Sequence, residues 1–260
     1  METLTFGKGN AKLGKNVFTF SLPSGFTCPG ALDCLSKANK ETGKIVDGPK
    51  TVFRCFSASQ EALYKNVRKS RWDNFDKLKA AMGTWEKDTN KMFAMADLIR
   101  ASIPKKANII RIHVAGDFFN QNYFNAWAYT AACRQDVLFY FYTKSLPFWI
   151  NRLDVIGNGR TSKGFELKNF VPTASYGGRN DELIKQYNLR TAQVVYSDAE
   201  AKKLKLVIDH DDTHAMKHGK DFALIIHGTQ PKGSDASKAL QVLKSNGFTG
   251  YGKKIPLQVV

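Results

Sequence analysis

The feature that most constrains the fold of this chain is the alternation of short apolar segments with longer amphipathic ones. Short runs rich in β-branched and aromatic residues are typical of buried β-strands. The sequence predicts such strands at Val17–Leu22, Thr51–Phe56, Ile109–Val114, Leu138–Tyr142, Phe170–Ser175, Thr191–Tyr196 and Phe222–His227. The glycine-rich stretch at residues 157–164 is predicted to be a loop.

Helices are predicted between these strands from apolar residues at helical spacing. A long helical stretch covers Ser59–Ile103, with a break near Gly83. Further helices are predicted around Trp127, at Pro147–Val155 and at Asp181–Tyr187. The order along the chain is therefore strand, helix, strand, repeated several times.

The fold class that follows is α/β, with mainly parallel strands. Near-continuous apolar strands separated by amphipathic helices indicate a buried parallel sheet with right-handed crossovers. We expect a (β/α) barrel or partial barrel. An open doubly wound sheet is the alternative, because periodicity does not distinguish a closed sheet from an open one. A chain of 260 residues is about the size of one barrel, so residues 1–260 are expected to form a single domain.

Polar side chains gather directly after the predicted strands. In parallel α/β sheets, ligands bind at the carboxyl ends of the strands. Candidates for binding a ligand or cofactor are therefore Asp117, Lys144, Ser175, Arg179, His227 and Gln230. Structural alternatives exist, since Asp117 could cap the following helix, and SYGGR at residues 175–179 could be an ordinary turn.

The most informative motif is a set of three cysteines. Cys28 and Cys34 lie in TCPGALDC, and Cys55 follows in VFRCF. Thiolates suit iron–sulfur clusters and zinc, and three of them could hold a 4Fe-4S cluster that leaves one iron open. Zinc is an alternative, although the spacing matches no common zinc motif. Simple burial of unreactive cysteines is another, and Cys133 is expected in the core.

Histidine and aspartate also cluster elsewhere. The run DHDDTH at residues 209–214 has the ligand types of a site for a divalent cation. Its structural alternative is that Asp212 caps a short helix over Thr213–His218. His113 lies within a predicted strand, where a buried histidine with a hydrogen-bond partner is the simpler interpretation.

The chain is strongly basic. It has 39 Lys and Arg residues against 23 Asp and Glu residues, a formal net charge of +16. Such a charge attracts polyanions, so nucleic acid is a candidate partner. The lysines form no long tract, and a merely solvated surface is the alternative.

No membrane partner is expected. The chain lacks the roughly 18 to 20 consecutive apolar residues of a membrane helix. Its start, METLTFGKGNAKLGK, has no apolar signal-peptide core. A cytoplasmic location follows as the expectation.

Several segments together resemble a phage protein family. They are FSLPSGFTCPGALDC, FRCFSAS, RIHVAGDFFNQNYFNAW, FYTKSL, TASYGGRND and FALIIHGTQPKGSDASKAL. The family is named after mycobacteriophage gene product 88, and the likeness runs from about Gly7 to Tyr251. It implies a viral protein that works inside the host cell, in the cytoplasm, and it carries no settled activity.

A more distant similarity is to the radical S-adenosylmethionine enzymes, whose barrel carries a three-cysteine 4Fe-4S cluster after its first strand. This resemblance implies that Cys28, Cys34 and Cys55 bind the cluster and that S-adenosylmethionine is a second cofactor. The segment 115–117, Ala-Gly-Asp, would stand near the family's Gly-Gly-Glu motif. The chain departs from the family pattern because it lacks the C-x3-C-x2-C loop, and its third cysteine comes from a different strand.

Two hypotheses cover these observations. The first is a phage-encoded 4Fe-4S protein with redox or radical chemistry on a substrate of unknown class. The second is a basic nucleic-acid binding or processing protein of phage replication, with structural cysteines or zinc. The two are compatible, because one protein can carry a cluster and bind nucleic acid.

Overall fold

The computed structural model describes residues 2–9, 13, 16–83, 87–248 and 250. Its main feature is a mostly parallel eight-stranded sheet with the order β1-β2-β5-β6-β7-β8-β10-β9. The strands are β1 (Gly7–Lys8), β2 (Val17–Thr19), β5 (Ile109–Ile112), β6 (Leu138–Thr143), β7 (Phe170–Ser175), β8 (Thr191–Val195), β9 (Val207–Ile208) and β10 (Phe222–Ile225). Among the described strands of this sheet, only the β1–β2 pair is antiparallel, and the other pairs are parallel.

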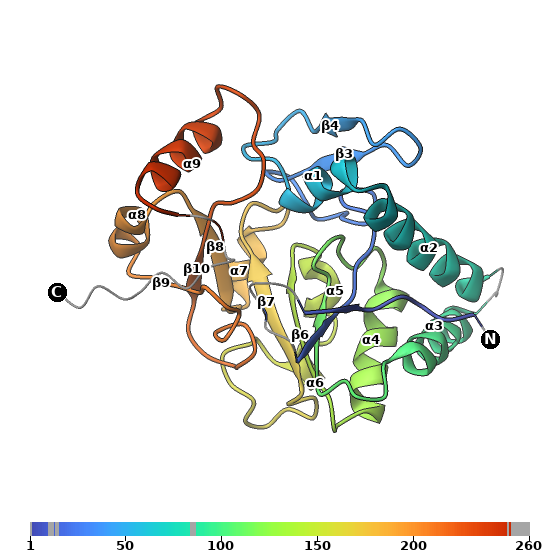
Figure 1. Cartoon of the computed structure of the whole chain (residues 1–260). Helices are drawn as coiled ribbons and strands as arrows, with labels where there is room; N and C mark the ends of the chain where they lie inside the picture. Colours follow the sequence, from blue (N-terminus) through green and yellow to red (C-terminus); the bar gives the residue numbers. More distant parts are fainter. Residues whose placement is uncertain (1, 10–12, 14–15, 84–86, 249, 251–260) are drawn as a thin grey trace.

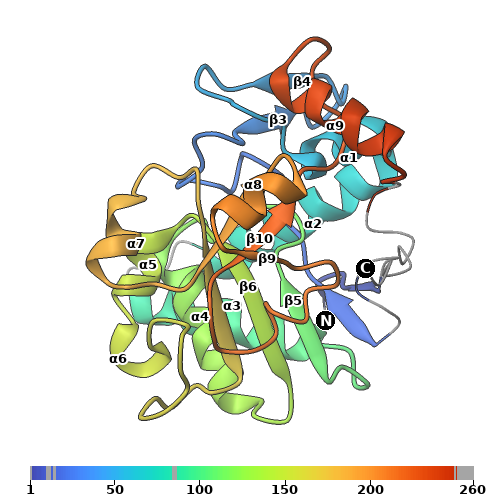
Figure 2. The same cartoon turned by 90° about the vertical axis from the view of Figure 1, so that its left-hand side faces the viewer.

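Helices connect the strands and cover the sheet (Figures 1 and 2). They are α1 (Phe56–Leu63), α2 (Lys65–Met82), α3 (Asp88–Ser102), α4 (Gln121–Cys133), α5 (Leu146–Ile150), α6 (Leu153–Ile156), α7 (Glu182–Gln186), α8 (Asp198–Lys203) and α9 (Asp235–Ser245). A separate hairpin of β3 (Ser36–Ala38) and β4 (Ile45–Asp47) lies beside α1.

The strand order explains the arrangement of the helices. From β2 to β8 the neighbours in the parallel sheet follow the order of the chain. Right-handed crossovers in one direction place their helices on one face of a sheet. The described strands therefore lack the central reversal of a doubly wound sheet. Their hydrogen-bonded order ends at β1 and β9, so a closed barrel is not shown.

The main core fills the space between the sheet and its helices. Because side chains alternate along a strand, Phe139 and Phe141 of β6 point to the same face. There they join Trp127 of α4, Ile99 of α3 and Phe170 of β7 in one buried cluster. Removing aromatic and aliphatic surface of this size from water stabilises the α/β layer strongly.

The opposite face of the sheet carries a smaller core. Tyr140, Val171 and Phe222 pack there against Ala215. Ala215 lies in residues 209–218, which comprise the DHDDTH segment and the four residues after it. This stretch crosses the same face of the sheet. The segment thus serves as a cover for the sheet, which accounts for its lack of regular helix.

A buried ion pair fastens this cover to the sheet. The carboxylate of fully buried Asp212 lies 2.7 Å from a guanidinium nitrogen of Arg111 in β5. The hydroxyls of Tyr140 and Tyr142 each donate to the same carboxylate at 3.1 Å. The expected helix cap at Asp212 is therefore wrong, since this side chain turns inward to the strands.

Most predicted strands and the helix break at Gly83 are confirmed, but the strand at Thr51–Phe56 is wrong. This segment is a loop that ends at Cys55, the N-cap of α1. The amides of Val52 and Phe53 donate to the carbonyl of Asp33 instead of to a sheet. The β3–β4 hairpin was not predicted, because its strands are short and partly polar.

The core assignment of Cys133 is also wrong. Cys133 is the last residue of α4 and is exposed. Trp127 and Ala131 lie one turn apart on the buried face, whereas a residue two positions beyond Ala131 points about 200° away around the helix. His113, by contrast, is buried, and its Nε2 lies 2.9 Å from the Tyr123 hydroxyl, as expected.

The Arg111–Asp212 pair yields a stability prediction. Asp212→Asn removes the charge but keeps a residue that tolerates its positive φ of 64°. Because the Arg111 charge is then buried without a counter-charge, we expect the free energy of unfolding to fall by about 3–5 kcal/mol in urea titrations. Adding Arg111→Met should restore most of it.

The matched control is Asp136→Asn, at an exposed ion pair with Arg134. Its effect should stay below about 1 kcal/mol. Equal effects of Asp212→Asn and Asp136→Asn would contradict a role for the buried pair.

Candidate functional site

The candidate site lies where loops from several strands meet above the carboxyl edge of the sheet. Cys28 and Cys34 lie in the long loop between β2 and β3, and Cys55 caps α1. All three are free thiols with partly exposed surfaces. The amides of Val52 and Phe53 donate to the Asp33 carbonyl, which places the segment that leads to Cys55 beside Cys34.

The thiols influence one another electrostatically. Burial raises the pKa of the Cys28 thiol well above its ordinary value. Negative charge on Asp117, Cys55 and Cys34 raises this pKa further. Since such effects fall with distance, the three thiols and Asp117 share one neighbourhood.

A lysine opposes this effect at Cys34. Burial raises the pKa of Cys34 to about 11, whereas the positive charge of Lys144 acts to lower it. Lys144 follows β6 and is only 7% exposed. Its ammonium donates to the hydroxyl of Ser175 at 2.6 Å and to the carbonyls of Ser175 and Tyr176. These acceptors are neutral, so the buried cation is available to balance a negative charge in the site.

Asp117 joins the ends of β5 and β6. Its carboxylate accepts hydrogen bonds from the Thr143 hydroxyl at 2.7 Å and from the Lys144 amide at 2.8 Å. Burial raises the pKa of Asp117, and these hydrogen bonds oppose the rise. Asp117 does not cap α4, because Asn120 accepts the Tyr123 amide as N-cap. Asp117, which was predicted to bind a ligand, therefore holds the backbone of Lys144 in place.

Glycines let the neighbouring loops approach the cysteine loop closely. A Cβ on Gly30, between Cys28 and Cys34, would lie 2.0 Å from the Lys144 carbonyl oxygen. A Cβ on Gly116, at a φ of +80°, would lie 2.6 Å from the Thr27 hydroxyl. Any other side chain at either position would push the cysteine loop away from the strand ends.

The loop after β10 supports the Cys55 segment. The side-chain amide of Gln230 accepts from the Arg54 amide at 2.7 Å and donates to the Arg54 carbonyl at 3.0 Å. The ring of His227 lies 4.6 Å, between centroids, from that of Phe56. The two residues predicted from this loop therefore contact the backbone and side chain on either side of Cys55.

Arg179 is placed less centrally. It is exposed, and its backbone amide donates to the Gly30 carbonyl at 2.9 Å. Of the six predicted residues outside the cysteines, Asp117, Lys144 and Ser175 lie in one hydrogen-bonded group. His227 and Gln230 form a second group at Cys55, and Arg179 lies at the rim.

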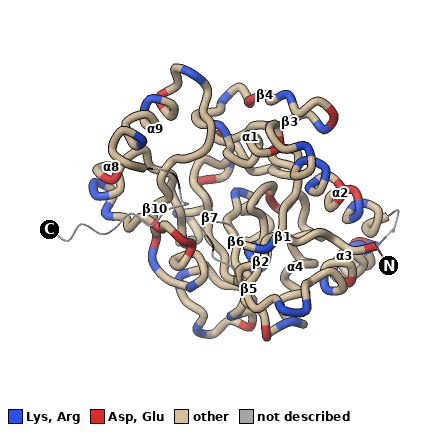
Figure 3. Tube along the Cα trace, in the orientation of Figure 1, with Lys and Arg blue, Asp and Glu red and all other residues tan. Residues whose placement is uncertain are grey.

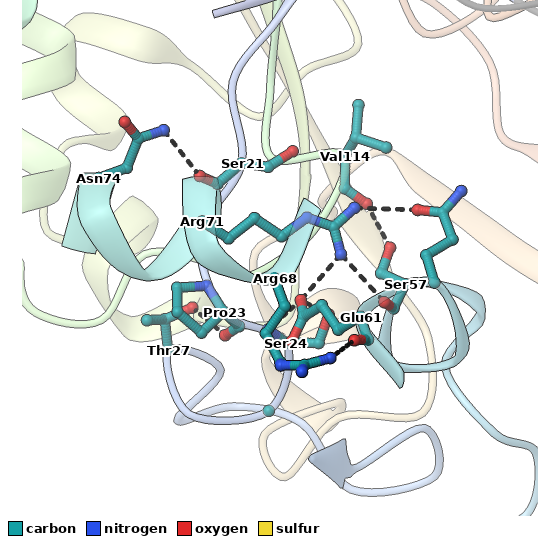
Figure 4. A network of polar contacts seen from close by, with 12 residues as sticks. Ser21, Pro23, Ser24, Thr27, Ser57, Glu61, Arg68, Arg71, Asn74 and Val114 are labelled. Atoms are coloured by element: carbon teal, nitrogen blue, oxygen red, sulfur yellow. Dashed lines mark hydrogen bonds and ion pairs between the residues drawn. The ribbon is translucent and has the colours of Figure 1, made fainter. Parts of the chain in front are cut away.

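Sequence reasoning missed the residue that connects the two cysteine-bearing segments. Glu61 of α1 is fully buried (Figure 4). One of its carboxylate oxygens accepts from the amide and the hydroxyl of Ser24, both at 2.9 Å. The same oxygen lies 2.8 Å from a guanidinium nitrogen of Arg71 in α2. Glu61 therefore fixes the loop that carries Cys28 against the helix that Cys55 caps.

The network continues into the sheet. Arg71 also donates to the carbonyl of Ser57 at 3.0 Å, and the Ser57 hydroxyl donates to the carbonyl of Val114 at 2.8 Å, just beyond β5 (Figure 4). The signal in the sequence is a charged residue at an apolar helical position. Glu61 lies one turn after Ser57 and Ala58, which are also buried.

The sequence offered two sets of candidate metal ligands, the DHDDTH segment and the three cysteines. Among the described residues, no three His, Cys, Asp or Glu side chains are grouped tightly enough to hold one metal ion. This includes the DHDDTH segment, in which the Asp209 carboxylate accepts hydrogen bonds from the amides of His214 and Ala215. Cys28, Cys34 and Cys55 lie within electrostatic range of one another, and Lys144 and the N-terminus of α1 supply positive potential nearby.

The comparisons with known proteins place the chain in a phage family. The family model described as gene product 88 matches residues 4–243. The chain belongs to this family. All three cysteines and all six other predicted residues fall within the matched range.

A curated relative is the Gene 88 protein of Mycobacterium phage D29, with 32% identity over 141 residues. The alignment covers 52% of this chain and 50% of the relative, so it spans about half the length of that protein. No solved structure matches the chain. Among the described residues, no helix is both long and apolar enough to cross a membrane.

The raised pKa of Cys34 predicts slow alkylation. In metal-free protein, the rate of Cys34 modification should still be rising above pH about 9.5, rather than levelling near the ordinary thiol pKa of about 8.5. Lys144→Met should displace the midpoint to higher pH, because it removes the charge that lowers this pKa. Peptide mass mapping would follow Cys34 separately.

Lys202→Met, at an exposed position of α8, is the control and should leave the profile unchanged. The described surroundings of Cys34 would be contradicted if the midpoint lay near pH 8.5 and Lys144→Met did not move it.

Proposed function

We propose that this protein binds a 4Fe-4S cluster through Cys28, Cys34 and Cys55, with one iron open to a further ligand. The observation that carries the proposal is the gathering of three free thiols beside the buried cation of Lys144. Thiolates are the ligands that iron–sulfur clusters use. Because each thiolate binds a different iron, the three sulfur atoms do not need to converge on one ion.

The electrostatics of the site support an anionic group. Thiolates and cluster together bring negative charge into a largely buried place. The Lys144 ammonium donates to the neutral oxygens of Ser175 and Tyr176 and can balance that charge. The eight-residue helix α1 begins directly after Cys55, so the positive end of its dipole favours an anionic group at this edge of the site.

Binding would be coupled to proton release. The pKa values of Cys28 and Cys34 are raised, so both thiols are protonated near neutral pH without a metal. Metal ligation needs the thiolates, and affinity should therefore weaken as pH falls. In this account Lys144 assists binding by favouring ionisation of Cys34.

We further infer that β2 to β10 form a partial barrel that presents the site at its carboxyl edge. The sequential strand order from β2 to β8 supports this inference. A bound cluster of this type supplies electron transfer or, with S-adenosylmethionine at the open iron, radical chemistry. The chain's own residues then orient the ligands: Asp117 positions Lys144, and Gln230 holds the Cys55 segment. The proposed place of action is the cytoplasm of the infected host cell.

Iron and acid-labile sulfide analysis of anaerobically purified protein tests this function. The parent protein should contain about four iron and four sulfide per chain and absorb broadly near ~400 nm. Cys28→Ser, Cys34→Ser and Cys55→Ser should each lose most of the iron, because each removes one ligand. Cys133→Ser is the matched control, since that thiol is exposed at the end of α4.

Full iron retention in all three site variants would overturn the assignment. Stoichiometric zinc without sulfide, lost in the same variants, would replace the cluster with the zinc alternative. If the cluster is present, a change in the electron paramagnetic resonance spectrum on adding S-adenosylmethionine tests the open iron.

A further inference from the structure

A row of aromatic rings covered by lysines lies next to the cysteine loop. It comprises Phe26, Trp72 and Phe75 with Lys37, Lys40 and Lys79, and we refer to it as the aromatic–lysine stripe. Its residues come from the cysteine loop, the β3–β4 hairpin and α2. It lies outside the cluster site and is not needed to form it.

The rings form a continuous series. The centroids of Phe26 and Trp72 are 4.9 Å apart, and those of Trp72 and Phe75 are 6.0 Å apart. Phe75 in turn packs against Phe119 at 5.2 Å. Phe26 is 41% exposed, which is unusual for a phenylalanine, and Trp72 and Phe75 are partly exposed. The rings are therefore partly accessible at successive positions along the surface.

The ammonium group of one lysine lies over each ring. The Nζ atoms of Lys37, Lys40 and Lys79 lie 5.1, 4.9 and 4.7 Å from the centroids of Phe26, Trp72 and Phe75. These distances are within the range of cation–π contacts. Positive charge is therefore held at regular places along the aromatic series.

Further charge surrounds the stripe. Lys65 and Lys69 are exposed on α2, where Lys69 pairs with Asp73, and Figure 3 shows basic residues along this helix. Asp76 pairs with Lys40 and Lys79, at 2.8 and 3.2 Å. Because exposed ion pairs of this kind contribute little, a phosphate group can compete with the carboxylate for these lysines.

We propose that the aromatic–lysine stripe binds single-stranded nucleic acid. Exposed rings stack on unpaired bases, and neighbouring lysines neutralise the phosphates. A duplex fits less well, because its bases already stack on one another. Phe26 is two residues from Cys28, so a bound strand would pass beside the proposed cluster site. The excess of 16 positive charges would then serve affinity for this partner.

Fluorescence anisotropy with labelled oligo-dT and oligo-U tests the charge component. We expect the triple variant Lys37→Gln/Lys40→Gln/Lys79→Gln to weaken binding at least about tenfold at low salt. The slope of log K against log salt concentration should become shallower by about 2, because each lost phosphate contact removes roughly 0.7. The control Lys202→Gln/Lys203→Gln/Lys238→Gln removes the same charge from α8 and α9 and should change both values much less.

Phe26→Leu tests the stacking component while keeping an apolar side chain in the loop. It should weaken oligonucleotide binding about fivefold or more and leave binding to heparin, a polyanion without bases, unchanged. Tyr187→Leu, at a similarly exposed ring, is the control. Circular dichroism and thermal unfolding would verify that each variant is folded.

The proposal is overturned if the parent protein does not bind either oligonucleotide at low salt, or if the stripe and control triple variants bind equally. Equal loss of oligonucleotide and heparin binding in Phe26→Leu would also overturn it, since the surface would then attract polyanions only. Tighter binding of oligo-dT or of oligo-U identifies the form of nucleic acid. Iron content is measured in parallel, so failure here is separate from failure of the cluster assignment.

Discussion

The buried carboxylate of Glu61 is the contact on which the candidate site depends. It joins the loop that carries Cys28, through Ser24, to the helix that begins at Cys55. Its partner Arg71 extends the connection into α2 and, through Ser57, to the end of β5. Taking two charges out of water is expensive unless hydrogen bonds satisfy them. Here three donors converge on one carboxylate oxygen, whereas the other, Oε2, is buried without a hydrogen-bond partner among the described residues.

The sheet supplies the second constraint. Strands that neighbour one another in chain order bring their following loops to one edge, and the cysteine loop, Asp117 and Lys144 meet there. The face of the sheet that lies away from the main core is closed by the Arg111–Asp212 pair and the segment around it. Helices on one side and this cover on the other leave the carboxyl edge as the place where polar groups gather.

Charge balance connects the structure to its proposed chemistry. The thiols of Cys28 and Cys34 are hard to ionise because most of their surface is buried. Lys144 is a buried cation whose contacts are neutral oxygens, and it eases ionisation of Cys34. Without a bound cluster the site therefore holds the Lys144 cation, the buried carboxyl group of Asp117 and protonated thiols. An anionic cluster would replace the protons and neutralise the lysine.

Much of the fold could be predicted, because the central strands are nearly continuous apolar runs and Gly83 ends a helix as expected. The same apolar pattern misled at Thr51–Phe56, where the amides of Val52 and Phe53 bond to the Asp33 carbonyl, Val52 is exposed, and Phe53 packs against the core cluster that includes β8 and β10 residues. The role of Asp212 depends on Arg111, 101 residues away (212 − 111), and local sequence cannot reveal such a partner.

The candidate site could be predicted in part. The rule that ligands bind at strand ends selected Asp117, Lys144 and Ser175, which do lie together. Glu61 was missed because it lies in a helix, away from any strand end. The aromatic–lysine stripe was missed because its residues come from three separate segments.

The claim that the three thiols hold one iron–sulfur cluster is tested most directly by diffraction at the iron absorption edge, with crystals grown without oxygen. We predict one compact anomalous peak within bonding distance of the Sγ atoms of Cys28, Cys34 and Cys55, with the Lys144 ammonium nearby. Crystals without anomalous iron at these thiols, or with iron bound at another place, would contradict it.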